Sequence, residues 1–277
     1  MPKTERNSPG TSNFKDFEHH GWQTVAGSYH DHFSSLTKQT IEPMLDAVKA
    51  RPNVDLLDVA TGPGYVAGRA KDRGCRVTAV DFSAVMVERA RQLYDGIIFE
   101  EGDAESLSYT DNSFDAVTMN FGLLHLARPE QALAEAFRVL KAGGKFAFTV
   151  WAKPEHALAF GIVLKAVEKF GDMSVTIPEG PPFFRFSNEG ESRRALIDAG
   201  FKNVEIAQLP LTWKLKSGDD FFAAFYLGTP RTGGLLRAQA PDALNAVKQA
   251  VLKDVAQYRD GDLIKIPMAA VLASGTK

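Results

Sequence analysis

The chain of 277 residues has one cysteine, no long apolar run and almost no net charge. Cys75 cannot form an internal disulfide and lies in no metal-ligand spacing, which favours a reducing, cytoplasmic compartment. No apolar stretch approaches the roughly 18 residues of a membrane span, and no signal-peptide pattern is found, so nothing indicates export. The formal net charge of −2 gives no broad basic field, so nucleic acid is not a favoured partner.

What the chain does have is an apolar strand that runs into a glycine turn. Residues 54–59 show no regular polar alternation, as in a strand buried on both faces of a parallel sheet. The turn Thr61-Gly62-Pro63-Gly64 follows, and a helical pattern begins after it. Strand, glycine turn and helix let backbone N–H groups and a helix N-terminus approach a ligand closely.

A second apolar strand, residues 76–81, ends in an acid. Asp81 follows Gly64 by 17 residues, close to the roughly 20-residue offset of an acid that binds ribose hydroxyls. A carboxylate suits that role because it accepts hydrogen bonds from both hydroxyls. The alternative is that Asp81 only caps the helix beginning at Ser83.

Strands and helices alternate through the first half of the chain. This alternation predicts an α/β fold, a parallel sheet with helices on both faces. Ligands bind at the carboxyl ends of the strands in such sheets. The expected strands are residues 54–59, 76–81, 97–99, 114–121 and 145–151. The polar and glycine residues at their carboxyl ends are Asp58, Gly62, Gly64, Asp81, Asp103, Asn120 and His125.

The flanking regions are expected to cover this sheet. Residues 1–13 are polar and rich in helix breakers, which predicts a disordered tail before a single domain over 14–277. Four histidines among residues 19–32 have no completing Cys or Asp/Glu cluster, so no metal is expected. After Trp151 we expect helices over 157–170, 189–199, 217–226 and 242–258, and strands over 204–213 and 263–274. These later helices are best explained as insertions that form a cap.

Five motifs occur together in a fixed order between about residues 55 and 151. They are residues 58–64, 79–83, 101–105, 114–117 and 140–145. This ordered set resembles the class I S-adenosylmethionine (SAM)-dependent methyltransferases, and most closely the ubiquinone/menaquinone-type C-methyltransferases and their small-molecule relatives. One departure is Ala60, where many members have the first glycine. The resemblance implies a Rossmann-like, seven-stranded, mostly parallel sheet whose last strand is antiparallel.

The resemblance also implies a division of the chain and a set of roles. Residues 54–151 would be the SAM-binding core, and 14–50, 152–187 and 215–260 the cap. Asp58 would orient the glycine turn or accept from the SAM amino group, Asp81 would hold the ribose, and Asp103 would accept from the adenine amino group. The expected cofactor-binding residues are Tyr29, Asp58, Ala60, Thr61, Gly62, Gly64, Asp81, Phe82, Ser83, Met86, Gly102, Asp103, Ala104, Glu105, Asn120, Phe121 and His125.

The expected reaction is direct transfer of a methyl group from SAM to a small acceptor, with S-adenosyl-L-homocysteine as product. Positioning alone can supply ~7–11 kcal/mol. Cap aromatics such as Phe160, Phe183 and Phe225 indicate an apolar or aromatic metabolite. His125 is the candidate catalytic residue, with a structural helix-start role as its alternative. A non-catalytic SAM-binding module and a nicotinamide-dependent oxidoreductase remain open, and a monomer or a homodimer is expected.

Overall fold

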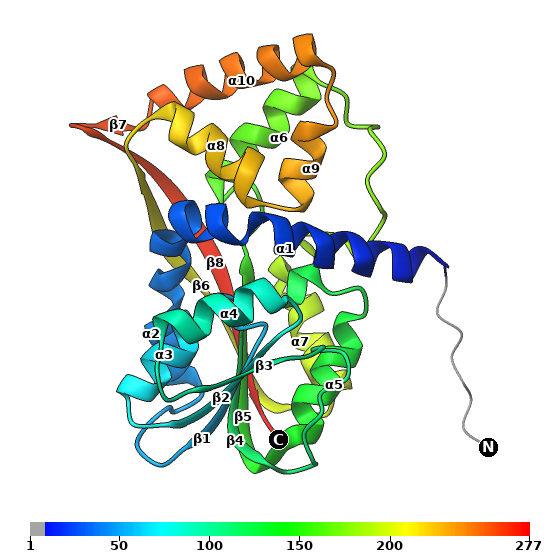
Figure 1. The fold of residues 1–277 in the computed structure, drawn as a ribbon, viewed down its shortest axis with the longest axis vertical. Helices are drawn as coiled ribbons and strands as arrows, with labels where there is room; N and C mark the ends of the chain where they lie inside the picture. The colour runs from blue at the N-terminus through cyan, green and yellow to red at the C-terminus, as the bar shows by residue number, and fades with distance from the viewer. Residues whose placement is uncertain (1–8) are drawn as a thin grey trace.

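The apolar runs of the sequence form the strands of one mixed β-sheet in the computed structural model, which describes residues 9–277 (Figure 1). The strand order is β3-β2-β1-β4-β5-β8-β6, and β7 pairs with β8 beside this path. Strands β1 to β5 are parallel, and β8 lies antiparallel between β5 and β6. The strands are β1 (Asp55–Val59), β2 (Arg76–Asp81), β3 (Ile98–Glu101), β4 (Phe114–Asn120), β5 (Leu140–Trp151), β6 (Lys202–Leu215), β7 (Arg259–Asp260) and β8 (Leu263–Thr276).

The expected fold is confirmed: a Rossmann-like sheet with an antiparallel last strand. The two-residue β7 adds a short hairpin strand that the pattern does not predict. Helices α2 (Ile41–Ala47), α3 (Tyr65–Asp72) and α4 (Ala84–Leu93) pack on one face of the sheet. Helices α5 (Pro129–Val139) and α7 (Glu189–Asp198) pack on the other. Strands β1 and β4 are buried on both faces along most of their length, which explains their lack of polar alternation.

The N-terminal segment is one long helix, α1 (Pro9–Thr37). Residues 1–8 of the expected tail lie outside the described residues, and residues 9–13 are helical, so the tail prediction is wrong for these five. The buried side of α1 follows helical spacing through Phe14, Glu18, Val25, Phe33 and Leu36. Its glycine at position 21 has a packing reason, because an added Cβ would lie 2.7 Å from a side-chain carbon of Pro230.

Four further helices lie above the carboxyl ends of β4 and β5. They are α6 (Leu158–Phe170), α8 (Gly218–Gly228), α9 (Arg231–Arg237) and α10 (Pro241–Ala256). Figure 1 shows α1 running between this group and the sheet. The buried residues Phe160, Phe225 and Val251 of the group belong to the same apolar core as the sheet residues Val117 and Phe148.

A 3-10 turn, η1 (Lys38–Thr40), joins α1 to α2. One strand boundary and one helix differ from expectation. Strand β5 begins at Leu140 rather than at 145, and its pairing with β4 shifts register across the Gly143-Gly144 pair. Helix α9 was not expected because it contains two glycines; a Cβ on Gly233 would lie 2.6 Å from the carbonyl oxygen of Phe225, so close packing on α8 requires glycine. Within residues 9–277, no helix is both long and apolar enough to cross a membrane.

Candidate active site

A pocket lies at the carboxyl ends of β1, β2 and β4, with α1 along one side. We call it the main pocket. Its lining residues are Trp22, Tyr29, Ala60, Gly62, Asp81, Phe82, Met86, Gly102, Asp103, Ala104, Asn120, Phe121, Gly122, His125 and Leu126. Most of the expected cofactor-binding residues are among them. The expected residues that do not line it are Asp58, Thr61, Gly64, Ser83 and Glu105.

The turn after β1 gives the main pocket an open backbone wall. Ala60, Gly62 and Gly64 all have left-handed backbone conformations, with φ of 53°, 53° and 83°. A Cβ added to Gly62 would meet no atom within 4 Å, so this side of the turn faces open space. A Cβ on Gly64 would lie 3.0 Å from the ring of Phe99, so that glycine instead allows close packing of α3.

Asp81 joins this turn to the next helix. Its carboxylate accepts one hydrogen bond from the Gly62 N–H at 2.8 Å and another from the Ser83 N–H at 2.9 Å. Burial raises the pKa of Asp81 to about 6, although the two N–H donors and the neighbouring His125 and His19 oppose that rise. Asp81 therefore braces the helix start, as its alternative role predicts, and it also lines the main pocket.

Asp58 lies behind the turn and not in the pocket. It accepts hydrogen bonds from the hydroxyls of Thr61 at 2.6 Å and Thr118 at 2.8 Å. Burial raises its pKa to about 7, against the lowering effect of the two hydroxyls. Of the two roles expected for Asp58, the contacts support orientation of the turn and not a direct contact with a ligand.

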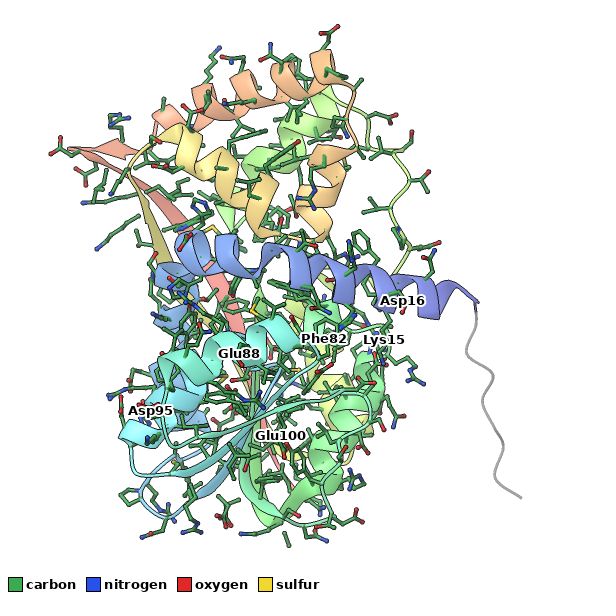
Figure 2. All side chains as sticks on the ribbon, in the orientation of Figure 1. Lys15, Asp16, Phe82, Glu88, Asp95 and Glu100 are labelled. Carbon is green, nitrogen blue, oxygen red and sulfur yellow. The ribbon has the colours of Figure 1, made fainter. Side chains whose placement is uncertain are left out.

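The rim of the main pocket is held by α1. Lys15 forms an ion pair with Asp103, and Asp103 also accepts from the N–H of Glu105 at 2.9 Å. Figure 2 shows Lys15 on the N-terminal part of α1, beside Phe82 at the start of the α4 segment. Glu105 is buried and accepts from the N–H of Arg128 at 2.7 Å, so it fixes a loop and does not face the pocket.

The opposite end of the main pocket is built by the residues that follow β4. The side-chain oxygen of Asn120 accepts from the hydroxyls of Thr40 at 2.8 Å and Thr149 at 2.5 Å, which fixes its orientation. Phe121 has a positive φ of 54° and stacks on Trp151 with ring centroids 4.1 Å apart. The backbone turns sharply at Phe121, so the 3-10 turn η2 (Leu123–His125) begins beside the pocket.

A second pocket adjoins the main pocket and is mostly aromatic. The two pockets share four lining residues: Trp22, Tyr29, Phe121 and His125. Burial raises the pKa of Tyr29 to about 12, so the phenol stays protonated at neutral pH. The other residues of the second pocket are Phe33, Trp151, Phe160, Phe183, Thr229, Arg231 and Thr232.

The comparisons with known proteins agree with this geometry. Residues 57–148 match the family model described as a methyltransferase domain. The chain is 35% identical over 191 residues to the ubiquinone/menaquinone biosynthesis C-methyltransferase UbiE of Sinorhizobium fredii, which covers 60% of this chain and 74% of that enzyme. The chain belongs to the class I SAM-dependent methyltransferases of the UbiE type, and its cofactor is SAM.

Other relatives match a shorter stretch. The chain is 43% identical over 111 residues to the demethylmenaquinone methyltransferase of Renibacterium salmoninarum, which is 40% of this chain and 47% of that enzyme. The matched stretch thus spans about half the length of that relative. Among solved structures, the YcgJ protein of Bacillus subtilis has a TM-score of 0.55 at 19% identity, over 86% of this chain and 98% of that one. A phosphoethanolamine N-methyltransferase 2 of Haemonchus contortus, solved with S-adenosyl-L-methionine, has a TM-score of 0.56 at 18% identity over 99% of this chain and 61% of that one.

Two site features were not found from the sequence. Gly122 and Leu126 line the main pocket through the sharp turn after β4, which no local pattern predicts. Glu18 was missed as well; it is buried on α1 and its Oε2 lies 3.0 Å from Nδ1 of His125. The residues described by the structure contain no group of three or more His, Cys, Asp or Glu side chains that could hold a metal ion.

Proposed function

We propose that this methyltransferase binds SAM in the main pocket and transfers its methyl group to a small, planar, partly aromatic acceptor held in the second pocket. The observation that carries the proposal is that the two pockets meet at four shared side chains, Trp22, Tyr29, Phe121 and His125. A donor and an acceptor in adjoining pockets are aligned before they react, and such positioning can supply ~7–11 kcal/mol.

Several features of the main pocket support binding of SAM there. The open wall at Gly62 leaves room for a ligand against the backbone, where a side chain would intrude. Asp81 would hold the ribose hydroxyls, since its carboxylate faces the pocket and retains lone pairs beyond the two N–H contacts. Phe82, Met86 and the Ala104 segment would enclose the adenine, and Asp103 would accept from its amino group.

The bound cofactor supplies a methyl carbon already activated on a sulfonium. The residues of this chain would position the acceptor, exclude water and receive a proton. Trp22, Tyr29 and Phe121 bring aromatic rings to the junction of the pockets, where ring faces stabilise a nearby cation.

The acceptor class follows from the second pocket and from the relatives. Seven Phe, Tyr and Trp side chains line this pocket and suit a flat ring, while Thr232 offers a hydroxyl to a ring oxygen. Two of the relatives are named a ubiquinone/menaquinone biosynthesis C-methyltransferase and a demethylmenaquinone methyltransferase. We therefore infer that a hydroquinone ring is the best candidate acceptor. The adjoining pockets and the names of these relatives also favour methyl transfer over hydride transfer and over cofactor binding without turnover.

The test is anaerobic incubation of the protein with SAM and a short-chain demethylmenaquinol, followed by mass spectrometry. We expect a product heavier by one methylene unit and an equal amount of S-adenosyl-L-homocysteine. Phe183→Leu, in the second pocket only, should raise KM for the quinol and leave the Kd for S-adenosyl-L-homocysteine unchanged. Tight cofactor binding without methylation of any quinol would contradict the acceptor class.

A further inference from the structure

A buried carboxylate stands behind the one histidine that lines both pockets. Glu18 has no exposed surface, and it lies on the apolar side of α1. Its Oε2 is 3.0 Å from Nδ1 of His125, and its Oε1 is buried with no hydrogen-bond partner among the described residues. A buried carboxylate costs several kcal/mol unless it is compensated, so this placement calls for a reason beyond packing.

The geometry fixes the imidazole of His125. The ring lies edge-on to Trp22, at a centroid distance of 4.8 Å and an angle of 87°, and edge-on to Phe183 at 5.9 Å. Nδ1 is held by Glu18, and Nε2 makes no hydrogen bond to the described residues. A carboxylate on one ring nitrogen sets the tautomer and leaves the other nitrogen as a proton acceptor.

Two further charged groups face the pair of Glu18 and His125 from different elements. Asp81 ends β2, and Arg231 begins α9 with its Nε 3.8 Å from Oε1 of Glu18. Arg231 donates to the carbonyl oxygens of Pro181 at 3.0 Å and Leu124 at 3.4 Å, and its guanidinium lies over the ring of Phe183. These contacts hold the positive charge of Arg231 beside Oε1 of Glu18.

We propose that Glu18 is a positioning residue that holds neutral His125 as its Nδ1–H tautomer, so that Nε2 accepts the proton released by the methyl acceptor. This inference rests on the proposed function and deepens it. The acceptor's O–H, N–H or activated C–H proton passes to Nε2, and the electron pair left behind forms the new bond to the methyl carbon. The pair of the broken carbon–sulfur bond stays on sulfur. The acceptor must therefore carry a dissociable proton, as a hydroquinone does on its hydroxyl oxygens. For transfer to a ring carbon, the electron pair reaches that carbon through the conjugated ring, and the C–H proton of that carbon leaves afterwards to restore the aromatic ring.

The first readout needs neither cofactor nor acceptor. In protein labelled with 15N-histidine, at a pH where the ring is neutral, the His125 signal should show a proton on Nδ1 and none on Nε2. The spectrum of His125→Gln identifies that signal among the six histidines. Glu18→Ala should shift the signal toward the Nε2–H form. A wild-type spectrum with the proton on Nε2 would overturn the proposal.

The second readout is the pH profile of methyl transfer to the quinol. Glu18→Gln keeps the shape and removes the charge, so kcat should fall about 10-fold to 100-fold, and the midpoint of the acidic limb should move down by about one pH unit. His125→Gln should lower kcat by about 10²–10⁴-fold. Asp16→Asn, on the exposed side of the same helix, is the matched control and should leave both quantities unchanged.

Binding of S-adenosyl-L-homocysteine separates this inference from the proposed function. Glu18→Gln should keep the wild-type Kd, because Glu18 lines neither pocket. A Glu18→Gln protein with wild-type kcat and an unshifted profile overturns the positioning role. If the wild type binds the cofactor but methylates no quinol, the proposed acceptor class is wrong. The tautomer of His125 still tests the role of Glu18 in that case.

Discussion

Ala60 and Gly122 leave no spare room between them: a Cβ added to Gly122 would lie 2.6 Å from the Cβ of Ala60. The two residues follow the neighbouring strands β1 and β4, and both line the main pocket. Ala60 also has a positive φ of 53°, a conformation that costs an L-residue about 1–2 kcal/mol and costs glycine nothing comparable. Position 60 therefore has a methyl group in a strained backbone conformation. Position 122, which faces it, is a glycine without a methyl group.

Gly122→Ala should therefore lower the free energy of unfolding by about 1–3 kcal/mol through overpacking. Adding Ala60→Gly should recover part of that loss, and Ala60→Gly alone should gain about 1 kcal/mol by relieving the backbone. Ala246→Gly, in the middle of α10, is the control and should lose about 1 kcal/mol. Denaturant unfolding of the four variants measures this, and strictly additive effects at positions 60 and 122 would contradict the contact.

Asp81→Ala should weaken S-adenosyl-L-homocysteine binding by about 10-fold to 100-fold while the fold persists, since hydrogen bonds to a charged group are worth about 1.5–3 kcal/mol. Because burial raises the pKa of Asp81 to about 6, the wild-type affinity should also fall as the pH drops below 6. Asp95→Ala, exposed at the far end of the α4 segment in Figure 2, is the control. Calorimetry showing equal Kd values for both variants would speak against a ribose role.

The pH dependence of stability should carry a signature of Asp58. Its pKa is about 7 in the folded chain, against about 3.9 when unfolded, so the folded state binds the proton more tightly. The stability gained in this way is fully present below pH 4 and is lost as the pH rises to about 7. Asp58→Asn cannot ionise, so its stability relative to wild type should rise by on the order of 1 kcal/mol or more between pH 4 and 7.

Unfolding in denaturant at several pH values measures that difference. Asp254→Asn, on α10, is the control and should give a constant difference from wild type. A difference for Asp58→Asn that stays constant with pH would mean that burial does not raise the pKa of this carboxyl.

The ion pair of Lys15 with Asp103 should control how fast the cofactor is released. Lys15→Ala loosens α1 at the pocket rim and leaves Asp103 free for the adenine amino group. The pair is partly exposed and worth at most about 1 kcal/mol, so the Kd should change less than about fivefold while the release rate increases. Lys265→Ala removes the pair with Asp260, far from the pocket, and serves as the control. Stopped-flow release of S-adenosyl-L-homocysteine with an unaltered rate in Lys15→Ala would contradict the role of α1.

The sheet could be predicted from the sequence because its strands are short apolar runs bounded by glycine turns. The predicted strands over residues 54–59, 76–81 and 114–121 match β1, β2 and β4 within one residue. Helices α1 and α9 could not be predicted from propensity, since both contain glycines. Gly21 and Gly233 are explained only by tertiary neighbours, a side-chain carbon of Pro230 and a carbonyl of Phe225.

The site residues at the carboxyl ends of the strands could be predicted from the sequence. The contacts that α1 makes with the site could not. Asp81, Asp103 and His125 line the main pocket as the strand order implies. Glu18 could have been found, because it occupies a position in the helical spacing of Phe14 and Val25 where an apolar residue is expected. Its partner Arg231 could not, since 213 residues separate the two and only the cap brings them together.

The most direct measurement is isothermal titration of the purified protein with SAM, S-adenosyl-L-homocysteine and NADH in parallel. The account predicts micromolar, one-to-one binding of the two sulfur ligands and none of NADH, with both affinities reduced in Asp81→Ala. Binding of NADH alone, or affinities for the sulfur ligands that do not respond to Asp81, would contradict the assignment of the main pocket.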